Sequence, residues 1–477
     1  MNIVSIEFPA IVLGSVFLYY LIPHRFRILF LSLLSAAFII SLNYVLLPYV
    51  LLFSAFNYFM GIRISNAENK LPAYRTGIVL NVLQLIIINY ASFTIDPIFQ
   101  IFDSTVKVSM VSKYIVPLGI SYYTLQGIGY LINIKMGWEK PERNFLAYVL
   151  YITFFPKFLS GPVERSNHFL PQLREEKQFE MPALVMGLRI ALFGYLKKVA
   201  IANQMAPFVI NAFTDLNSAD GSSLLLLIFL LPMYLYFDFS GYTDIAIGFA
   251  RMFGINLLPN FNRPFFAENV TTFWKRFHIS LASWFGDYIF RQTVFRRRKW
   301  GNYASMYALL ITWVLFGIWH GAGWNFMVLG FLQALAINYE FFTRKWRYKV
   351  MSKLPKPVRR WTGRVLVYLF YGISLVFFFS SDLESTFQFF SRMFTGGGLD
   401  LRGILMEIPL SALVLILFFM VLEWLEEDYT RIFDSLKLFW SGSGFWNRIF
   451  RWSTYSFILT VLYVTGNEIQ QFIYVQF

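Results

Sequence analysis

Two of the four histidines lie where they could act as a base. His278 stands in the run TTFWKRFHISLASWF and His320 in LFGIWHGAGWNF. A basic run at 296–299 separates them, beginning 18 residues after the first histidine and ending 21 residues before the second. If both intervening segments are helices, the two imidazoles reach a similar depth on the side away from the basic run. A neutral imidazole there accepts a proton from a hydroxyl, because its pKa lies near neutral.

Two other interpretations of the same histidines stay open from the pattern alone. The pair could be core histidines that hydrogen-bond to the backbone or pack on aromatic rings. A zinc site is the weaker interpretation, because two histidines without a nearby third ligand make an incomplete set. The remaining two histidines are predicted to be structural, since His24 lies among Arg25 and Arg27 and His168 lies in a polar loop.

A third segment, YLYFDFSGYTDIAIG, places two acids inside an apolar stretch. Asp238 and Asp244 are six residues apart and do not share one helical face, so a carboxylate dyad is not expected. Asp238 is predicted to orient a histidine or, more simply, to pair with a basic residue. Ser240 and Ser283 lack the GxSxG turn of serine acyl-enzymes, and the chain has no cysteine for a thiol nucleophile.

The elements that must position these groups are membrane helices. Of the 477 residues, 57% are hydrophobic and 14% are charged, whereas an ordinary soluble domain has about 25% charged residues. The apolar blocks do not alternate as barrel strands do, so the spans are helical. The sequence predicts an all-α, polytopic membrane protein with roughly 10–13 membrane helices, some short or re-entrant. The candidate spans lie near 4–22, 28–46, 47–62, 77–95, 114–134, 146–160, 183–213, 222–250, 303–319, 324–342, 363–381, 405–424 and 450–473.

The net charge of +14 comes from basic clusters between the apolar blocks. Such clusters are typical of cytoplasmic loops that face anionic lipid. No zinc-finger, RRM or helix-turn-helix pattern accompanies them, which argues against a nucleic-acid partner. The positive-inside rule predicts that 296–299 and 344–360 lie in the cytoplasm. It predicts that 381–400 and both termini lie outside the cytoplasm. The N-terminal apolar stretch has no cleavage signal and is predicted to be a retained first helix.

Five motifs together resemble the membrane-bound O-acyltransferase family. They are PLGISYYTLQGIGYLI (117–132), FFPKFLSGPVERSNHFLPQL (154–173), YFDFSGYTDIAIG (236–248), NFNRPFFAENVTTFWKRFHISLASWF (260–285) and GIWHGAGWNF (317–326). Within the family the chain, including its ending FIYVQF, is similar to the bacterial alginate O-acetylation branch. Gly286 and Asn133 depart from that branch, which has an arginine and an aspartate there, and the run RRRKW is closer to the related teichoic-acid D-alanyl transfer proteins.

The resemblance implies a single integral membrane domain over 1–477, in a bacterial inner membrane, around a central tunnel. An acyl thioester, acetyl-CoA or a loaded acyl-carrier protein, enters from the cytosol as substrate. The acyl group passes to hydroxyls of a cell-surface or exported polysaccharide, with an extracytoplasmic SGNH-type acyltransferase or esterase as partner. No bound cofactor and no metal are expected.

The resemblance also assigns roles to residues. The family's essential histidine falls on His320 and its second histidine on His278. Substrate contacts are predicted for Asp238, Trp274, Trp319 and Asn325. Two alternatives remain. The chain could be a conduit or scaffold that hands the acyl group to a separate external transferase, or it could transfer D-alanine to a polymer that resembles teichoic acid.

Overall fold

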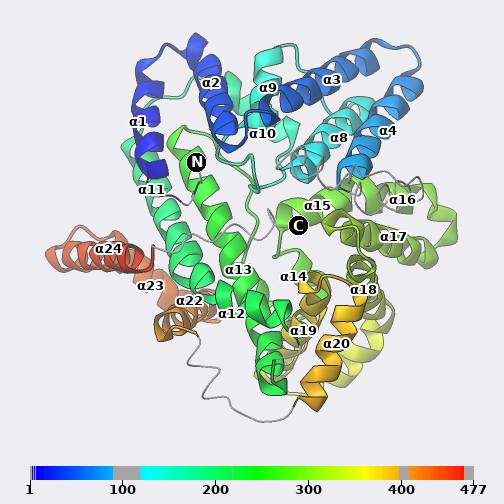
Figure 1. Ribbon diagram of the computed structural model, residues 1–477, viewed down its shortest axis with the longest axis vertical. Helices are drawn as coiled ribbons and strands as arrows, with labels where there is room; N and C mark the ends of the chain where they lie inside the picture. The colour runs from blue at the N-terminus through cyan, green and yellow to red at the C-terminus, as the bar shows by residue number, and fades with distance from the viewer. Residues whose placement is uncertain are drawn as a thin grey trace, which may run out of the picture. The chain divides into compact units, whose positions relative to one another are not determined.

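The computed structural model describes residues 3, 5, 7–89, 119–216, 219–396 and 408–466. Every regular element in these ranges is a helix, and the described backbone pairs in extended form at one isolated bridge, between Phe261 and Phe277. The predicted all-α class is therefore confirmed (Figure 1). The ending FIYVQF and the C-terminus, for which sequence predictions were also made, lie outside the described residues, as does part of the 381–400 loop.

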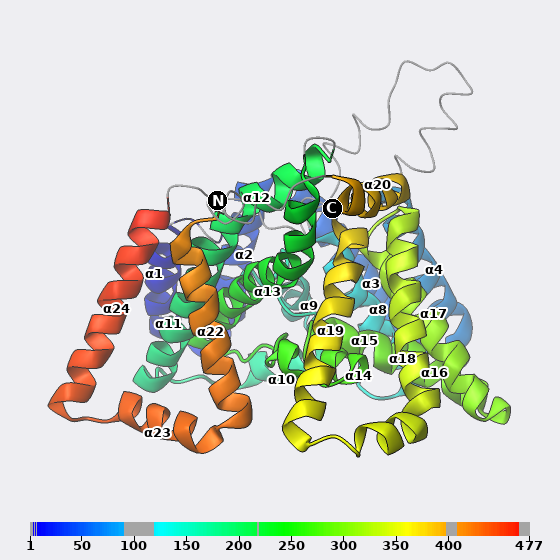
Figure 2. The same cartoon turned by 90° about the horizontal axis from the view of Figure 1, so that it is seen from below.

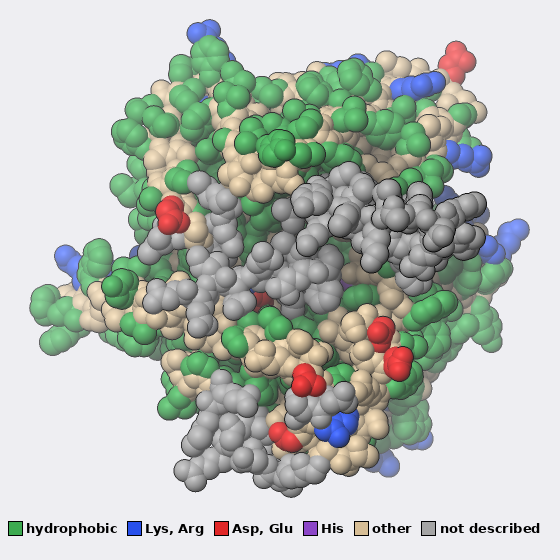
Figure 3. Space-filling model, in the orientation of Figure 1, with side chains coloured by type: hydrophobic (Ala, Val, Ile, Leu, Met, Phe, Trp, Pro, Cys, Tyr) green, Lys and Arg blue, Asp and Glu red, His purple; other side chains and the backbone are tan. Residues whose placement is uncertain are grey.

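Six of the described helices are long and apolar enough to cross a membrane. They are α2 (His24–Leu42), α3 (Leu46–Asn66), α13 (Gly221–Met252), α17 (Asn302–His320), α18 (Trp324–Met351) and α19 (Lys356–Phe379). Large apolar side chains on them are exposed, among them Leu33, Phe59 and Leu335. Hydrophobic side chains also cover much of the face drawn in Figure 3. These features are those of a multi-pass membrane protein, because such a surface is stable only in lipid.

Other predicted spans are short or broken, as the sequence indicated. The 146–160 span becomes α9 (Phe145–Thr153) and then turns, because Pro156 has no backbone N–H to continue a helix. The 183–213 span is divided by a stretch of π-helix. It consists of α11 (Met181–Tyr195), η1 (Leu196–Ala202) and α12 (Asn203–Thr214). The wider number of 10–13 membrane helices stays a prediction.

The first of two compact units covers Met1–Ala191 and Thr243–Pro259 in the described part of the chain. Some of its buried polar side chains bond to one another, which offsets the cost of burying them. The side-chain amides of Asn57 on α3 and Asn81 on α4 bond reciprocally, at 3.2 and 2.9 Å. The helices named here for the first time are α1 (Glu7–Leu21), α4 (Lys70–Asn89), α8 (Ile120–Met136) and α10 (Ser166–Arg174).

The second unit covers Leu192–Tyr242 and Asn260–Ile473. It contains α17, α18 and α19, of which α18 packs against both of the others (Figure 2). Its other helices are η2 (Pro264–Phe266), α14 (Val270–Trp274), α15 (Ile279–Phe285), η3 (Gly286–Phe290), α16 (Arg291–Arg296), η4 (Arg298–Trp300), α20 (Leu383–Thr395), α22 (Leu410–Asp428), α23 (Thr430–Ser441) and α24 (Phe445–Thr465). This unit contains both histidines of the predicted site.

Glycines set the close approach of α17 to α18. A Cβ atom on Gly317 would lie 2.2 Å from the carbonyl oxygen of Phe326, and one on Gly330 would lie 2.2 Å from the carbonyl oxygen of Trp313. Real Cβ atoms cannot approach backbone oxygens so closely, so only glycine permits this contact. The contact places the first turn of α18 beside the end of α17, where His320 lies.

Candidate functional site

The two predicted histidines end the two limbs of one helical hairpin. His278 is the N-cap residue of α15, and α15, η3 and α16 continue from it as far as Arg296. After the basic run, α17 begins at Asn302 and ends at His320. The two helical limbs that the spacing predicts are thus confirmed. The first limb contains a π-helical stretch, so it is not the uniform α-helix that the spacing argument used.

The aromatic residue Trp319 lies beside both imidazoles. Its ring centroid is 6.4 Å from that of His278 and 4.8 Å from that of His320. Phe239 on α13 lies 4.6 Å from His278, edge to face, and Phe316 lies 4.9 Å from His320. The two histidines therefore lie in one aromatic surrounding.

The two imidazoles differ in exposure. His278 is 1% exposed, whereas His320 keeps partial exposure at the end of α17. Burial of His278 disfavours the charged form of its ring, and the neutral form accepts one hydrogen bond and donates another. His320 is therefore the more accessible of the two rings.

A short segment before η2 holds His278 in an unusual backbone conformation. His278 has a φ of 47°, in the left-handed region that non-glycine residues rarely adopt. The carbonyl oxygen of Asn260 accepts a hydrogen bond from the backbone N–H of Ile279 at 2.9 Å. The side-chain oxygen of Asn260 accepts from the hydroxyl of Ser280 at 2.5 Å. These bonds fix the backbone on the C-terminal side of His278.

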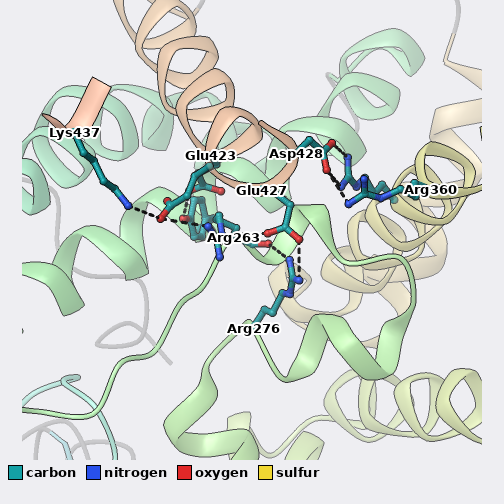
Figure 4. Close-up of polar contacts among 10 residues, drawn as sticks. Arg263, Arg276, Arg360, Glu423, Glu427, Asp428 and Lys437 are labelled. Atoms are coloured by element: carbon teal, nitrogen blue, oxygen red, sulfur yellow. Dashed lines mark hydrogen bonds and ion pairs between the residues drawn. The ribbon is translucent and has the colours of Figure 1, made fainter. Parts of the chain in front are cut away.

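An acidic residue of α22 holds the other side of the same loop. The guanidinium of Arg276, two residues before His278, lies 2.9 Å from Oε1 of Glu427 (Figure 4). Arg263, the other described non-glycine residue with a positive φ, lies 3.2 Å from Oε2 of the same carboxylate. The Glu427 carboxylate thus joins the segment around Arg263 to the segment around His278, the two places where the described backbone has a non-glycine residue with a positive φ. Sequence reasoning missed this contact, and its signal was the acidic run EWLEED at the end of an apolar helix.

Asp238 forms a buried ion pair. Its carboxylate accepts from Nζ of Lys198 in η1, and both side chains are 1% exposed. The structure therefore gives Asp238 the basic partner that the sequence indicated. The sequence analysis did not name Lys198, because a contact between residues 40 positions apart leaves no local pattern. A substrate contact of Asp238 stays a prediction.

Trp274 and Asn325 bond to neighbouring helices. Nε1 of Trp274 donates to Oε1 of Gln333 on α18 at 3.1 Å. Nδ2 of Asn325 donates to the carbonyl oxygens of Phe377 and Ser380, at 3.0 and 2.8 Å. These contacts hold α14, α18 and α19 together next to the histidines. The predicted substrate contacts of Trp274, Trp319 and Asn325 remain predictions.

The described residues include no group of three or more histidine or acidic side chains that could hold a metal ion. His168, predicted to be structural, lies with Nδ1 2.9 Å from Oε2 of Glu164. This hydrogen bond raises the pKa of the imidazole. The contact ties the start of α10 to the turn before it and agrees with a structural function.

Comparison with known proteins gives the family. Residues 138–381 match the MBOAT, membrane-bound O-acyltransferase, family. The chain is also 30% identical over 385 residues to a probable alginate O-acetylase of Azotobacter vinelandii, with 80% of this chain and 75% of that protein covered. The chain belongs to the membrane-bound O-acyltransferase family. The protein is therefore an enzyme that transfers acyl groups, as the motifs predicted.

Two further relatives of this membrane-bound O-acyltransferase carry different names. The peptidoglycan O-acetyltransferase of Helicobacter pylori is 29% identical over 408 residues, with 78% of this chain and 75% of that protein covered. The teichoic acid D-alanyltransferase of Bacillus subtilis is 31% identical over 254 residues, with 51% of this chain and 63% of that protein covered. The family match at 138–381 includes both histidines and all four residues predicted to contact the substrate.

Proposed function

We propose that this acyltransferase moves an acetyl group from a cytosolic thioester, through a tunnel, to hydroxyls of a cell-surface or exported polysaccharide. The observation that carries the proposal is the pair His278 and His320 around Trp319, within the segment that matches the family. The names of two relatives, an alginate O-acetylase and a peptidoglycan O-acetyltransferase, support acetyl as the group and a polysaccharide as the acceptor.

In the proposed reaction His320 is the general base. The acceptor oxygen attacks the thioester carbonyl carbon while its proton passes to the imidazole of His320. The new C–O bond forms, the C–S bond breaks, and the leaving thiolate takes the proton from the imidazolium, so the histidine ends neutral. His278 is a positioning residue, since a buried neutral ring is suited to a fixed hydrogen bond. The rings of Phe239 and Phe316 exclude water that would hydrolyse the thioester.

Charge supports a cytosolic donor of the coenzyme A type. The basic run 296–299 is exposed at the bend of the hairpin, away from the two histidines. Acetyl-CoA is strongly anionic, so such a bend raises its local concentration. On the opposite side of the membrane, an SGNH-type protein takes the acetyl group or completes its transfer to the polysaccharide.

D-alanine is the second candidate acyl group. The teichoic acid D-alanyltransferase of Bacillus subtilis, at 31% identity, favours it. The donor is then a D-alanyl thioester on a carrier protein, and the chemistry at the histidine is unchanged. The nature of the donor therefore separates the two candidates.

The test uses inside-out membrane vesicles that contain the full chain. Radiolabelled acetyl-CoA is added outside, with a D-alanyl carrier thioester in a parallel arm, and the lumenal polymer is analysed for label. Acetate on the polymer that depends on His320 supports the proposal, and D-alanine on the polymer supports the second candidate. Transfer that continues at the full rate in the His320→Ala variant contradicts base catalysis and favours a conduit for a separate transferase.

A further inference from the structure

A cavity of about 540 Å³ lies between α18 and α19. Its lining includes residues of the 344–360 segment, which joins the two helices. We call it the α18–α19 cavity. Its wall has two chemically different parts. Arg344, Arg347 and Arg359 line one part, and apolar side chains such as Leu366 and Phe370 line the other. Such a wall fits a molecule with an anionic head and an apolar body.

The acids of the cavity already have partners. The carboxylate of Glu340 accepts from the backbone N–H groups of Val270 and Thr271, at 2.6 and 3.0 Å, and from the Thr271 hydroxyl at 2.7 Å. Glu268 lies 3.1 Å from Nε of Arg360. These carboxylate oxygens therefore hold α14 and α19, and in the described part of the chain neither acid forms an ion pair with Arg344, Arg347 or Arg359.

Two cations remain for a ligand. Within the part of the chain that the structure describes, the side chains of Arg344 and Arg359 make no hydrogen bond or ion pair. Arg347 is fixed beside them, because it donates to the hydroxyl of Thr343 at 3.0 Å and to the carbonyl of Glu340 at 2.8 Å. Like charges that face one cavity repel, so an anion between Arg344 and Arg359 stabilises the arrangement.

We propose that the α18–α19 cavity binds an anionic phospholipid. The phosphate lies between Arg344 and Arg359, whose planar guanidinium groups match phosphate oxygens. One acyl chain follows Leu366 and Phe370 toward the bilayer core.

The aromatic residues of the cavity place it at the level of lipid headgroups. Trp346 and Tyr348 line it and are 61% and 72% exposed. Tryptophan and tyrosine gather at the interface between membrane and water. The 344–360 segment is predicted to face the cytoplasm, where anionic lipids attract basic clusters. A free anion such as phosphate uses the same guanidinium groups but leaves the apolar wall empty, so the observations favour a lipid.

The experiment measures lipid binding to the purified full chain in neutral detergent. Short-chain phosphatidylglycerol, phosphatidylcholine and glycerol phosphate are titrated separately by native mass spectrometry. The test variant is Arg344→Gln with Arg359→Gln. The matched control is Lys345→Gln with Lys349→Gln, which removes the same charge from α18 positions that do not line the cavity.

We expect phosphatidylglycerol to bind at least about tenfold more tightly than phosphatidylcholine. The arginine variant should lose about tenfold in affinity, because a charge-assisted bond is removed, and the lysine control should change less than about twofold. Equal weakening by both variants would show general surface attraction and overturn the proposal. Equal binding of glycerol phosphate, which has no acyl chain, would replace the lipid by a free phosphate. Single arginine variants, checked for a monodisperse elution profile, keep the test valid if the double variant does not fold.

Discussion

At the scale of single residues, the site divides its chemistry between two histidines of unequal exposure. His278 is enclosed, and its loop is held by Asn260 on one side and by Glu427 on the other, whereas His320 ends a helix at a glycine-flanked turn. A base must touch the reacting hydroxyl, and a positioning group need only touch the base or the thioester. The different surroundings of the two rings therefore argue for different roles.

This division predicts unequal losses of activity. The His320→Ala variant should lose about 10²–10⁴ in acyl transfer rate, because a positioned base is removed. The His278→Ala variant should lose about tenfold or less, as expected for one neutral hydrogen bond of about 0.5–1.5 kcal/mol. Rates are measured on membranes and normalised to the amount of inserted protein. A near-normal rate in His320→Ala, or equal losses in both variants, would contradict the assignment.

The buried pair of Lys198 and Asp238 gives a stability prediction. Removing one partner leaves an uncompensated charge, so Lys198→Met should lower the free energy of unfolding by about 3–5 kcal/mol. The double variant Lys198→Met with Asp238→Asn removes both charges and should recover most of that loss. Thermal unfolding of the purified chain in detergent measures both. A double variant as unstable as the single one would show that the pair is not the main interaction.

The same double variant tests the predicted substrate contact of Asp238. If the carboxylate only pairs with Lys198, acyl transfer should return together with stability. If it also binds substrate, the double variant should fold and yet have a raised apparent KM. The rate assay described for the histidine variants separates these outcomes.

At the scale of elements, the end of α22 positions the loop that contains His278. Glu427 is 14% exposed and bonds both Arg263 and Arg276, whereas neighbouring Glu426 is 37% exposed and lies 3.3 Å from Arg263 and 3.6 Å from Lys437. Exposed ion pairs contribute about 0–1 kcal/mol, and a less exposed carboxylate with both oxygens bonded contributes more. Glu427 is therefore the acid on which the geometry of the loop depends.

Replacing Glu427 by Gln should lower kcat about tenfold with little change in donor KM, because the loop moves while the cytosolic bend is untouched. Glu426→Gln is the matched control and should keep kcat within about twofold. Steady-state kinetics on reconstituted protein measures both constants. A loss confined to KM, or equal losses in the two variants, would show that the carboxylate does not position His278.

The close contact between α17 and α18 predicts that alanine substitutions at two glycines differ sharply in their effect on stability and activity. Gly317→Ala forces its Cβ onto the carbonyl of Phe326, so it should destabilise the protein by about 1–3 kcal/mol and reduce activity by displacing His320. Gly286→Ala places its Cβ in open space and has a helical φ of −59°, so it should change stability by less than about 1 kcal/mol. Thermal unfolding and transfer rate are measured together. Similar effects of the two substitutions would mean that the close helix contact does not matter.

At the scale of the whole chain, composition and spacing gave the fold class and the hairpin, because both depend on local sequence. The apolar blocks predict helices in lipid. The numbers of residues between the basic run and His278 and His320 predict two helical limbs. The partners Lys198 and Glu427 could not be predicted in the same way. Each meets its partner only after distant helices pack, and a single lysine or an acidic run at a helix end has many structural uses.

The consecutive spans α17, α18 and α19 also bear on topology. A chain that crosses the membrane three times brings Asn302, at the start of α17, to the side opposite Ser381, which follows α19. The turn between α18 and α19 then lies on the side of Asn302, in agreement with the basic character of 296–299 and 344–360. If each of these three helices crosses the membrane, their order places both basic segments on one face and Ser381 on the other.

Because the native chain has no cysteine, single cysteines report this topology directly. Asn302 and Ser381 are both exposed, so either position accepts a label without unfolding. In intact cells an impermeant maleimide should label Ser381→Cys and leave Asn302→Cys unlabelled, because charge places the basic bend in the cytoplasm. Permeabilised cells, in which both should react, control for accessibility. Labelling of Asn302→Cys from outside intact cells would invert the orientation and place the basic bend away from the cytosolic donor.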